Sequence, residues 1–337
     1  MQPEISPEQS PEKSPEPQPE ALAGTAEQPA AGTRPVDRRV TLRSDLRAAI
    51  PDAGAAVAVT AAVFVFFWAR MESGTSDTVA VMPFMSDPAE YWMYLLSQAF
   101  GWSGLLWAWG TVMLGLVLSG PGVGRRHRTL ERWHRTTSLT TMALMAAHAL
   151  MFAAELVRYE EKLGWAARLW TGFADSFVPG WYDSGTGRTA IPIGQGALYL
   201  AIPLGLLFYV RHRIGTTTWR RLHRFVIVVY VLSVWHTLLY GTNVWYGSWP
   251  RTALWLLQIP VAALLLLRLL RPARPSERLP APGGNVRLPA WTLRAAGRLT
   301  AAAVVIALAA VVVTGRDGGR DRPAEPPTTQ PHVHETE

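Results

Sequence analysis

Long apolar segments alternate with short polar segments along most of this chain. An apolar run of about 20 residues is long enough to cross a bilayer as a helix. The pattern predicts seven such helices, over residues 53–69, 92–119, 136–157, 190–210, 225–244, 250–270 and 299–314. The last has an apolar core that is short for a bilayer, so a re-entrant or surface helix is the alternative there. The predicted fold is all-α, a polytopic membrane bundle with a six-helix core and a seventh helix.

Lys and Arg are distributed unequally between the loops. The rich loops are 34–47, 121–135, 211–224 and 268–298. They hold 22 Lys and Arg side chains, against 9 in the segments on the other side. Because cytoplasmic loops are enriched in Lys and Arg, we expect a plasma-membrane protein with its N-terminus in the cytoplasm. The third and fifth helices then both run outward.

The polar ends of the chain lack the apolar content of a folded core. Residues 1–45 are rich in Pro and Glu, and we expect a disordered cytoplasmic tail rather than a signal peptide. The expected transmembrane domain covers 46–271, followed by a cytoplasmic linker at 272–298 and a disordered tail at 315–337. The net charge is +7, but the arginines flank the predicted helices. We therefore expect the lipid bilayer as the partner of this surface, and no nucleic acid.

Four histidines lie within or at the start of two predicted helices. His134 and His148 are fourteen residues apart, and His223 and His236 are thirteen apart. Fourteen helical residues span roughly 21 Å, which no single metal ion can bridge. Since the two helices run in the same direction, His134 should lie level with His223, and His148 with His236. We call His134 and His223 the inner pair, and His148 and His236 the outer pair.

A pair of imidazoles suits a haem iron better than other metal ions. Zinc usually has four protein ligands, or three and a water, whereas haem iron lacks only two axial donors. The sequence therefore predicts two bis-histidine haems with all four histidines as ligands of iron. There is no cysteine, which excludes disulfides, cysteine-ligated iron–sulfur clusters and thioether-linked haem. Helix packing or proton relay by these histidines remains the alternative.

Arginines flank both inner histidines at the same offsets. The two sequences are Arg132-Trp133-His134-Arg135 and Arg221-Leu222-His223-Arg224. A guanidinium forms strong charge-assisted hydrogen bonds with a carboxylate. Arg135 and Arg224 are therefore candidate partners of haem propionates, or else residues that only set the orientation in the membrane.

The spacing of thirteen residues conflicts with one ideal helix. It would leave His236 about 140° around the helix from His223, whereas fourteen residues return His148 to within roughly 40° of His134. We expect a π-bulge or a 3₁₀ turn in the fifth helix. The alternative is that His223 precedes the regular helix.

The paired spacings, each introduced by a basic loop, resemble the ferric reductase-like transmembrane domain family. This family includes the membrane halves of NADPH oxidases and ferric reductases, and the haem subunit of the bacterial methionine-sulfoxide-reductase system. The resemblance covers roughly residues 53–270. It implies a six-helix core with haem b between the third and fifth helices, the inner haem on His134 and His223, and the outer haem on His148 and His236. Some members bind fewer haems, which leaves the inner site open.

The oxidase and reductase members continue into flavin and NADPH domains. Only 67 residues follow Leu270, so we expect no bound flavin or NADPH site and an oxidoreductase subunit that depends on partners. The expected donor is a cytoplasmic flavin reductase or a membrane quinol, and the acceptor at the outer face is unknown. The long segment 158–189 should cover the outer haem or dock the acceptor, with Glu155 nearby. The alternatives are a transporter or channel with functional histidines, and a non-catalytic membrane anchor.

Overall fold

The computed structural model describes residues 41–120, 127–159, 162–183, 185–245 and 247–270. Beyond these, it describes residues 292, 295–299, 302, 303, 305 and 306. The predicted tails at 1–40 and 315–337 and the linker up to residue 291 lie outside the described residues. So does most of the predicted seventh helix, of which only residues 299, 302, 303, 305 and 306 are described.

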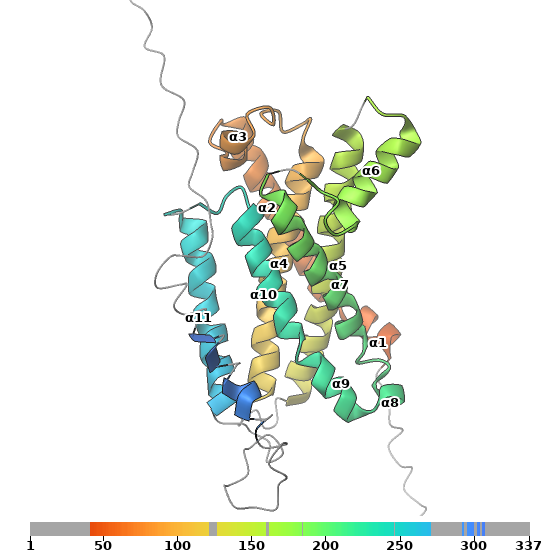
Figure 1. Cartoon of the computed structure of the whole chain (residues 1–337), viewed down its shortest axis with the longest axis vertical. Coiled ribbons are helices and arrows are strands. Elements are labelled where there is room, and N and C mark those ends of the chain that lie inside the picture. Colours follow the sequence, from red (N-terminus) through yellow and green to blue (C-terminus); the bar gives the residue numbers. More distant parts are fainter. Residues whose placement is uncertain are drawn as a thin grey trace, which may run out of the picture. The chain divides into compact units, whose positions relative to one another are not determined.

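The described residues form helices joined by turns, and no strand occurs among them. The long helices are α2 (Ile50–Glu72), α4 (Trp92–Leu118), α5 (His127–Tyr159), α7 (Gly187–Leu206), α10 (Val226–Tyr240) and α11 (Trp249–Leu270). The shorter helices are α1 (Leu42–Ala48), α3 (Asp77–Val81), α6 (Trp165–Phe177), α8 (Arg211–Ile214) and α9 (Thr216–His223). Figure 1 shows the long helices side by side.

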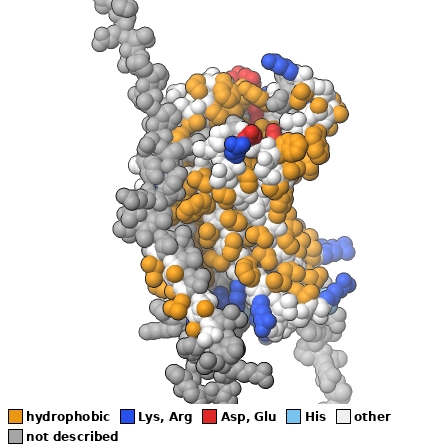
Figure 2. Space-filling model, in the orientation of Figure 1, with side chains coloured by type: hydrophobic (Ala, Val, Ile, Leu, Met, Phe, Trp, Pro, Cys, Tyr) orange, Lys and Arg blue, Asp and Glu red, His pale blue; other side chains and the backbone are white. Residues whose placement is uncertain are grey.

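Six segments are long and apolar enough to cross a membrane, and the fifth comprises α9 together with α10. They coincide with the first six predicted spans, so the prediction of an all-α polytopic bundle is confirmed. The longest helix, α5, has 33 residues and extends about 50 Å, well beyond the roughly 30 Å of a bilayer core. On the face drawn in Figure 2, hydrophobic side chains form a broad band, and several Lys and Arg side chains gather at the end that carries α8 and α9.

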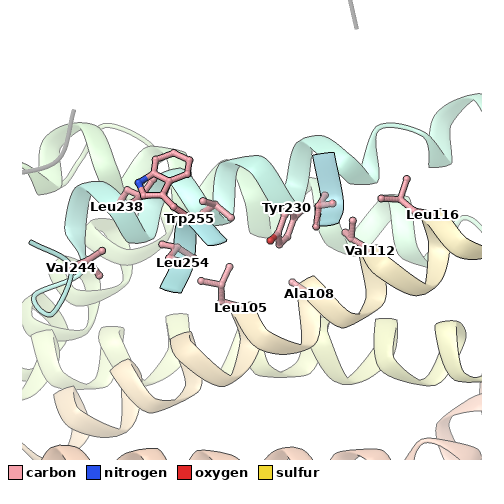
Figure 3. Close-up of a cluster of buried hydrophobic side chains, with 11 residues drawn as sticks. Leu105, Ala108, Val112, Leu116, Tyr230, Leu238, Val244, Leu254 and Trp255 are labelled. Atoms are coloured by element: carbon pink, nitrogen blue, oxygen red, sulfur yellow. The ribbon is translucent and has the colours of Figure 1, made fainter. Parts of the chain in front are cut away.

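Helix α4 is the centre of the bundle, since it contacts α2, α5, α10 and α11. Its buried residues Leu105, Ala108, Val112 and Leu116 follow each other at intervals of three or four, and so form one helical face. This face packs against buried side chains of α10 and α11, among them Tyr230, Leu238, Leu254 and Trp255 (Figure 3). The other main contact of α4 is with α5, which carries His134 and His148.

The fifth predicted span is interrupted directly after His223. This residue ends α9, and α10 begins at Val226. The junction contains i→i+3 hydrogen bonds of the 3₁₀ type, from Phe225 N to Leu222 O at 2.9 Å and from Val228 N to Phe225 O at 2.9 Å. The expected turn of the 3₁₀ type therefore occurs between α9 and α10. Because His223 lies before this turn, it also precedes the long helix α10, as the alternative proposed.

The predicted outer segment 158–189 contains α6, which packs against the end of α5. A Cβ on Gly172 would lie 2.5 Å from Val157 Cγ2, so only glycine allows this approach. Arg168 donates hydrogen bonds to the carbonyl oxygens of Val157 (2.9 Å) and Arg158 (3.0 Å). These are among the last carbonyls of α5, which have no partner within the helix. The 13 residues of α6 in this segment thus form a helix that is fixed to the bundle.

Candidate functional site

The four predicted histidines form the two predicted pairs. The ring centroids of His134 and His223 are 6.0 Å apart, and those of His148 and His236 are 6.1 Å apart. Because the earlier residue of each helix pairs with the earlier residue of the other, α5 and the α9–α10 segment run in the same direction. The parallel arrangement expected from the arginines is therefore present.

The separation within each pair suits one ion between two imidazoles. A metal–imidazole bond is about 2 Å and the nitrogen lies about 1 Å from the ring centre, so an ion held from both sides separates the centroids by roughly 6 Å. Among the described residues, no group of three or more His, Asp or Glu side chains is placed to hold a metal ion. Each pair thus offers two donors, which is the number that a haem iron requires.

Three of the four rings are oriented by a backbone carbonyl on a neighbouring helix. Nδ1 of His134 lies 3.0 Å from Thr111 O, Nδ1 of His148 lies 2.7 Å from Ser97 O, and Nδ1 of His236 lies 2.8 Å from Ala190 O. A carbonyl only accepts, so each Nδ1 carries the proton and donates it. The tautomer is thereby fixed with the lone pair on Nε2, as is usual for histidines that bind metal.

A glycine lies four residues after each of these carbonyls. Cβ atoms built on Gly101, Gly115 and Gly194 would lie 3.1 Å, 3.0 Å and 2.7 Å from atoms of the rings of His148, His134 and His236. The residue at position i+4 covers the carbonyl of residue i in a helix. A side chain there would push the ring away from the carbonyl that orients it, so each carbonyl and its glycine act as one seat for an imidazole.

His223 is held differently from the other three histidines. Its Nδ1 is buried and makes no hydrogen bond of regular geometry among the described residues, although the backbone carbonyl of Leu204 in α7 lies close enough to interact with it. Its ring stacks on Trp219, one turn earlier in α9, with centroids 5.5 Å apart and an angle of 28° between the planes. This ring is positioned by an aromatic contact within its own short helix.

Each pair lies in its own cavity. The outer pair lines a cavity with an empty volume of about 1230 Å³, including its open side, and the inner pair lines one of about 1410 Å³. The cavities approach each other on α5, where Met142 lines the inner cavity and Met145, less than one turn later, lines the outer one.

The two candidate propionate partners, Arg135 and Arg224, both line the inner cavity. Arg135 already has a partner, because its Nε lies 2.9 Å from Oδ2 of Asp45 in α1. Asp45 is only 4% exposed and also accepts a hydrogen bond of 3.0 Å from the hydroxyl of Tyr209. The folded region therefore begins before residue 46, within the segment expected to be a tail.

Sequence reasoning missed two further arginines in the inner cavity. Arg220 and Arg268 line it together with Arg135 and Arg224. Arg220 lies three residues before His223, so its helical spacing could have identified it. Arg268 lies at the end of α11, and nothing in the local sequence places it near the histidines.

Glu155 does not line either cavity. It is buried, and its carboxylate is ion-paired with Arg158 at 3.0 Å. Glu155 therefore does not lie in the outer cavity, where a cofactor was expected. It forms an ion pair near the end of α5 instead.

Comparison with known proteins gives a match for the central part of this bundle. Residues 100–234 match the family model described as "Ferric reductase like transmembrane component". The match begins in α4 and ends in α10, and so includes three of the four paired histidines and all three glycine seats. It confirms the resemblance predicted from the histidine spacing. No curated protein and no solved structure matches the chain.

Proposed function

We propose that this chain, whose residues 100–234 match the model of the ferric reductase-like transmembrane family, binds two b-type haems and carries electrons across a membrane. Such a membrane domain is suited to electron transfer across the bilayer, and haem b would supply the one-electron chemistry. The remaining steps of the proposal concern what the residues of this chain do.

The observation that carries the proposal is the separation and orientation of the paired imidazole rings. Each pair has the separation that a shared iron requires, and three rings donate Nδ1–H to a carbonyl, which leaves Nε2 available. A histidine that serves only helix packing has no need for a partner ring at this distance in a cavity. The residues therefore fit the group that the family implies, with His134 and His223 at the inner site and His148 and His236 at the outer site.

Charged side chains distinguish the two ends of the proposed route. Arg220, Arg224 and Arg268 line the inner cavity, where guanidinium groups would pair with haem carboxylates. Arg135 also lines the inner cavity, but its positive charge is largely balanced by the ion pair with Asp45. In this proposal the arginine-rich end faces the cytoplasm, the protein lies in the plasma membrane, and electrons move from the inner to the outer site.

The donor and acceptor are separate molecules in this proposal. A cytoplasmic flavin reductase or a membrane quinol reduces the inner site, and an acceptor at the outer face oxidises the outer site. The close approach of the two cavities at Met142 and Met145 supports direct transfer between the sites.

Haem stoichiometry in variants tests the proposal. Purified protein should contain two non-covalent haems per chain with a six-coordinate b-type spectrum that sharpens on reduction. His134→Ala and His148→Ala should each remove one haem, whereas His212→Ala, an exposed histidine in α8, should remove none. Colourless protein from cells supplied with haem would refute the proposal and favour a transporter or channel. Unchanged function in His148→Leu would favour an anchor.

A further inference from the structure

The two cavities differ sharply in charge. The inner cavity is lined by Glu131 and four arginines. Among the described residues that line the outer cavity, there is no Lys, Arg, Asp or Glu. The outer cavity is therefore a low-dielectric space in which an ion has no countercharge.

One group of neutral polar side chains at the outer cavity is joined by hydrogen bonds. Gln98 Nε2 donates to the hydroxyls of Thr78 (3.2 Å) and Thr242 (3.1 Å), and these hydroxyls are 2.8 Å apart. Asn243 Nδ2 donates to Gln98 Oε1 at 3.4 Å. This network joins α3, α4 and the turn between α10 and α11, at the end of the bundle farthest from α8 and α9 (Figure 1). It can offer hydrogen bonds to a visiting molecule, but no net charge.

Six charged side chains near this end form three ion pairs. Glu155 pairs with Arg158 at 3.0 Å, Asp183 with Arg188 at 2.8 Å, and Arg70 with Asp77 at 3.2 Å. Such pairs produce little field outside themselves, because their opposite charges cancel over short distances. These pairs do not create a positive potential that extends to the outer cavity. The buried Arg251 lies close by, but it donates a hydrogen bond to the carbonyl of Val244 and does not line the cavity.

We propose that the outer site delivers electrons to an uncharged acceptor that enters this cavity, and not to an anion such as a ferric polycarboxylate. The proposal rests on the proposed function, because the outer haem would bring two carboxylates into a cavity without a cation. An anion would lose its hydration there and would also be repelled by those carboxylates. A neutral molecule with an oxygen acceptor atom avoids both costs and can accept a hydrogen bond from the amides.

The test uses two acceptors that differ mainly in charge, 1,4-naphthoquinone and its 2-sulfonate. Holoprotein is reduced anaerobically, and reoxidation of the haem is followed by stopped-flow absorbance. Each quinone takes two electrons, one from each reduced haem iron, and two protons from water, and becomes the hydroquinone. Reoxidation by the neutral quinone should be at least about tenfold faster and independent of salt, whereas the sulfonate should react faster as salt screens the repulsion.

A charge placed at the cavity provides the matched control. Asn243→Lys should raise the ratio of the sulfonate rate to the neutral-quinone rate about tenfold, and the isosteric Asn243→Asp should lower this ratio below its wild-type value. A sulfonate rate equal to or above the neutral rate in wild-type protein, or one that falls as salt rises, would overturn the inference. The haem spectrum before mixing separates the two hypotheses, since protein without haem contradicts the proposed function itself.

Discussion

Alanine substitutions at the three glycine seats test the histidine sites separately. The added Cβ would meet His236 at 2.7 Å in Gly194→Ala, His134 at 3.0 Å in Gly115→Ala and His148 at 3.1 Å in Gly101→Ala. Nine in ten Cβ contacts in proteins are longer than 3.4 Å and almost none is shorter than 3.0 Å, so each ring must move by a few tenths of an ångström. The carbonyl that orients each ring lies on the same helix as the substituted glycine. It therefore cannot move with the ring, and the hydrogen bond between them is weakened.

The size of the effect follows from the cost of overpacking. Extra atoms in a well-packed site cost about 1–3 kcal/mol, which corresponds to a loss of haem affinity of roughly five- to 150-fold. Gly194→Ala should show the largest loss, because its contact is the shortest. Two glycines on the same helices serve as controls: a Cβ on Gly110 meets nothing within 4 Å, and a Cβ on Gly196 lies 3.8 Å from Leu232 Cδ1.

The assay is haem retention per chain during dilution into haem-binding apoprotein, followed by absorbance. Gly115→Ala should release the inner haem faster, and Gly101→Ala and Gly194→Ala should release the outer haem faster. Gly110→Ala and Gly196→Ala should retain both haems, with unfolding stability raised by up to about 1 kcal/mol, since alanine favours a helix over glycine. Equal haem loss in all five variants, or none in Gly194→Ala, would refute the role of these glycines.

Three further predictions concern other parts of the chain. Asp45→Ala should lower the free energy of unfolding by about 3 kcal/mol, because it leaves the poorly exposed Arg135 without its nearest countercharge. The measurement is thermal unfolding in detergent, in which the control variant Asp45→Asn should lose less stability. Arg168→Ala should remove two charge-assisted hydrogen bonds from the end of α5 and so increase hydrogen exchange in α6, whereas unchanged exchange there would mean that Gly172 alone holds the helix. In the proposed function the electron donor is a separate molecule, so NADPH alone should not reduce the haem and NADPH with a flavin reductase should; rapid reduction by NADPH alone would contradict the proposed partner.

The sequence predicted the helices and the histidine pairs because both depend on regular spacing along the chain. Apolar runs marked the six spans, and loop arginines gave the parallel direction that makes His134 level with His223. The same reasoning could have found the glycine seats on α4, because Gly101 and Gly115 are fourteen residues apart, as His134 and His148 are. The facing helix repeats the spacing of the rings that it supports.

Contacts between distant segments could not be read from the sequence in this way. Asp45 follows a Pro- and Glu-rich stretch, and only the packing of α1 against α5 brings it to Arg135. Arg268 reaches the inner cavity from α11. Periodicity shows which face of a helix is buried, but it does not show which other helix supplies the neighbouring charge.

The inner site is built from less regular structure than the outer site. His148 and His236 lie within long helices, and both rings are oriented by carbonyls. His223 ends the eight-residue α9, its Nδ1 makes no hydrogen bond of regular geometry among the described residues, and a 3₁₀-type junction follows it. A short helix and a weakly bonded ring allow local opening at lower free energy.

We therefore expect the inner haem to be released first as denaturant is raised. The measurement is haem absorbance in a urea titration, with His148→Ala reporting the inner haem alone and His134→Ala the outer haem alone. Loss in His148→Ala should begin at a lower urea concentration than in His134→Ala, and in wild-type protein it should precede the loss of helical circular dichroism. If the outer haem were released first, the carbonyl and glycine seats would contribute less to retention than the stacking of Trp219 on His223.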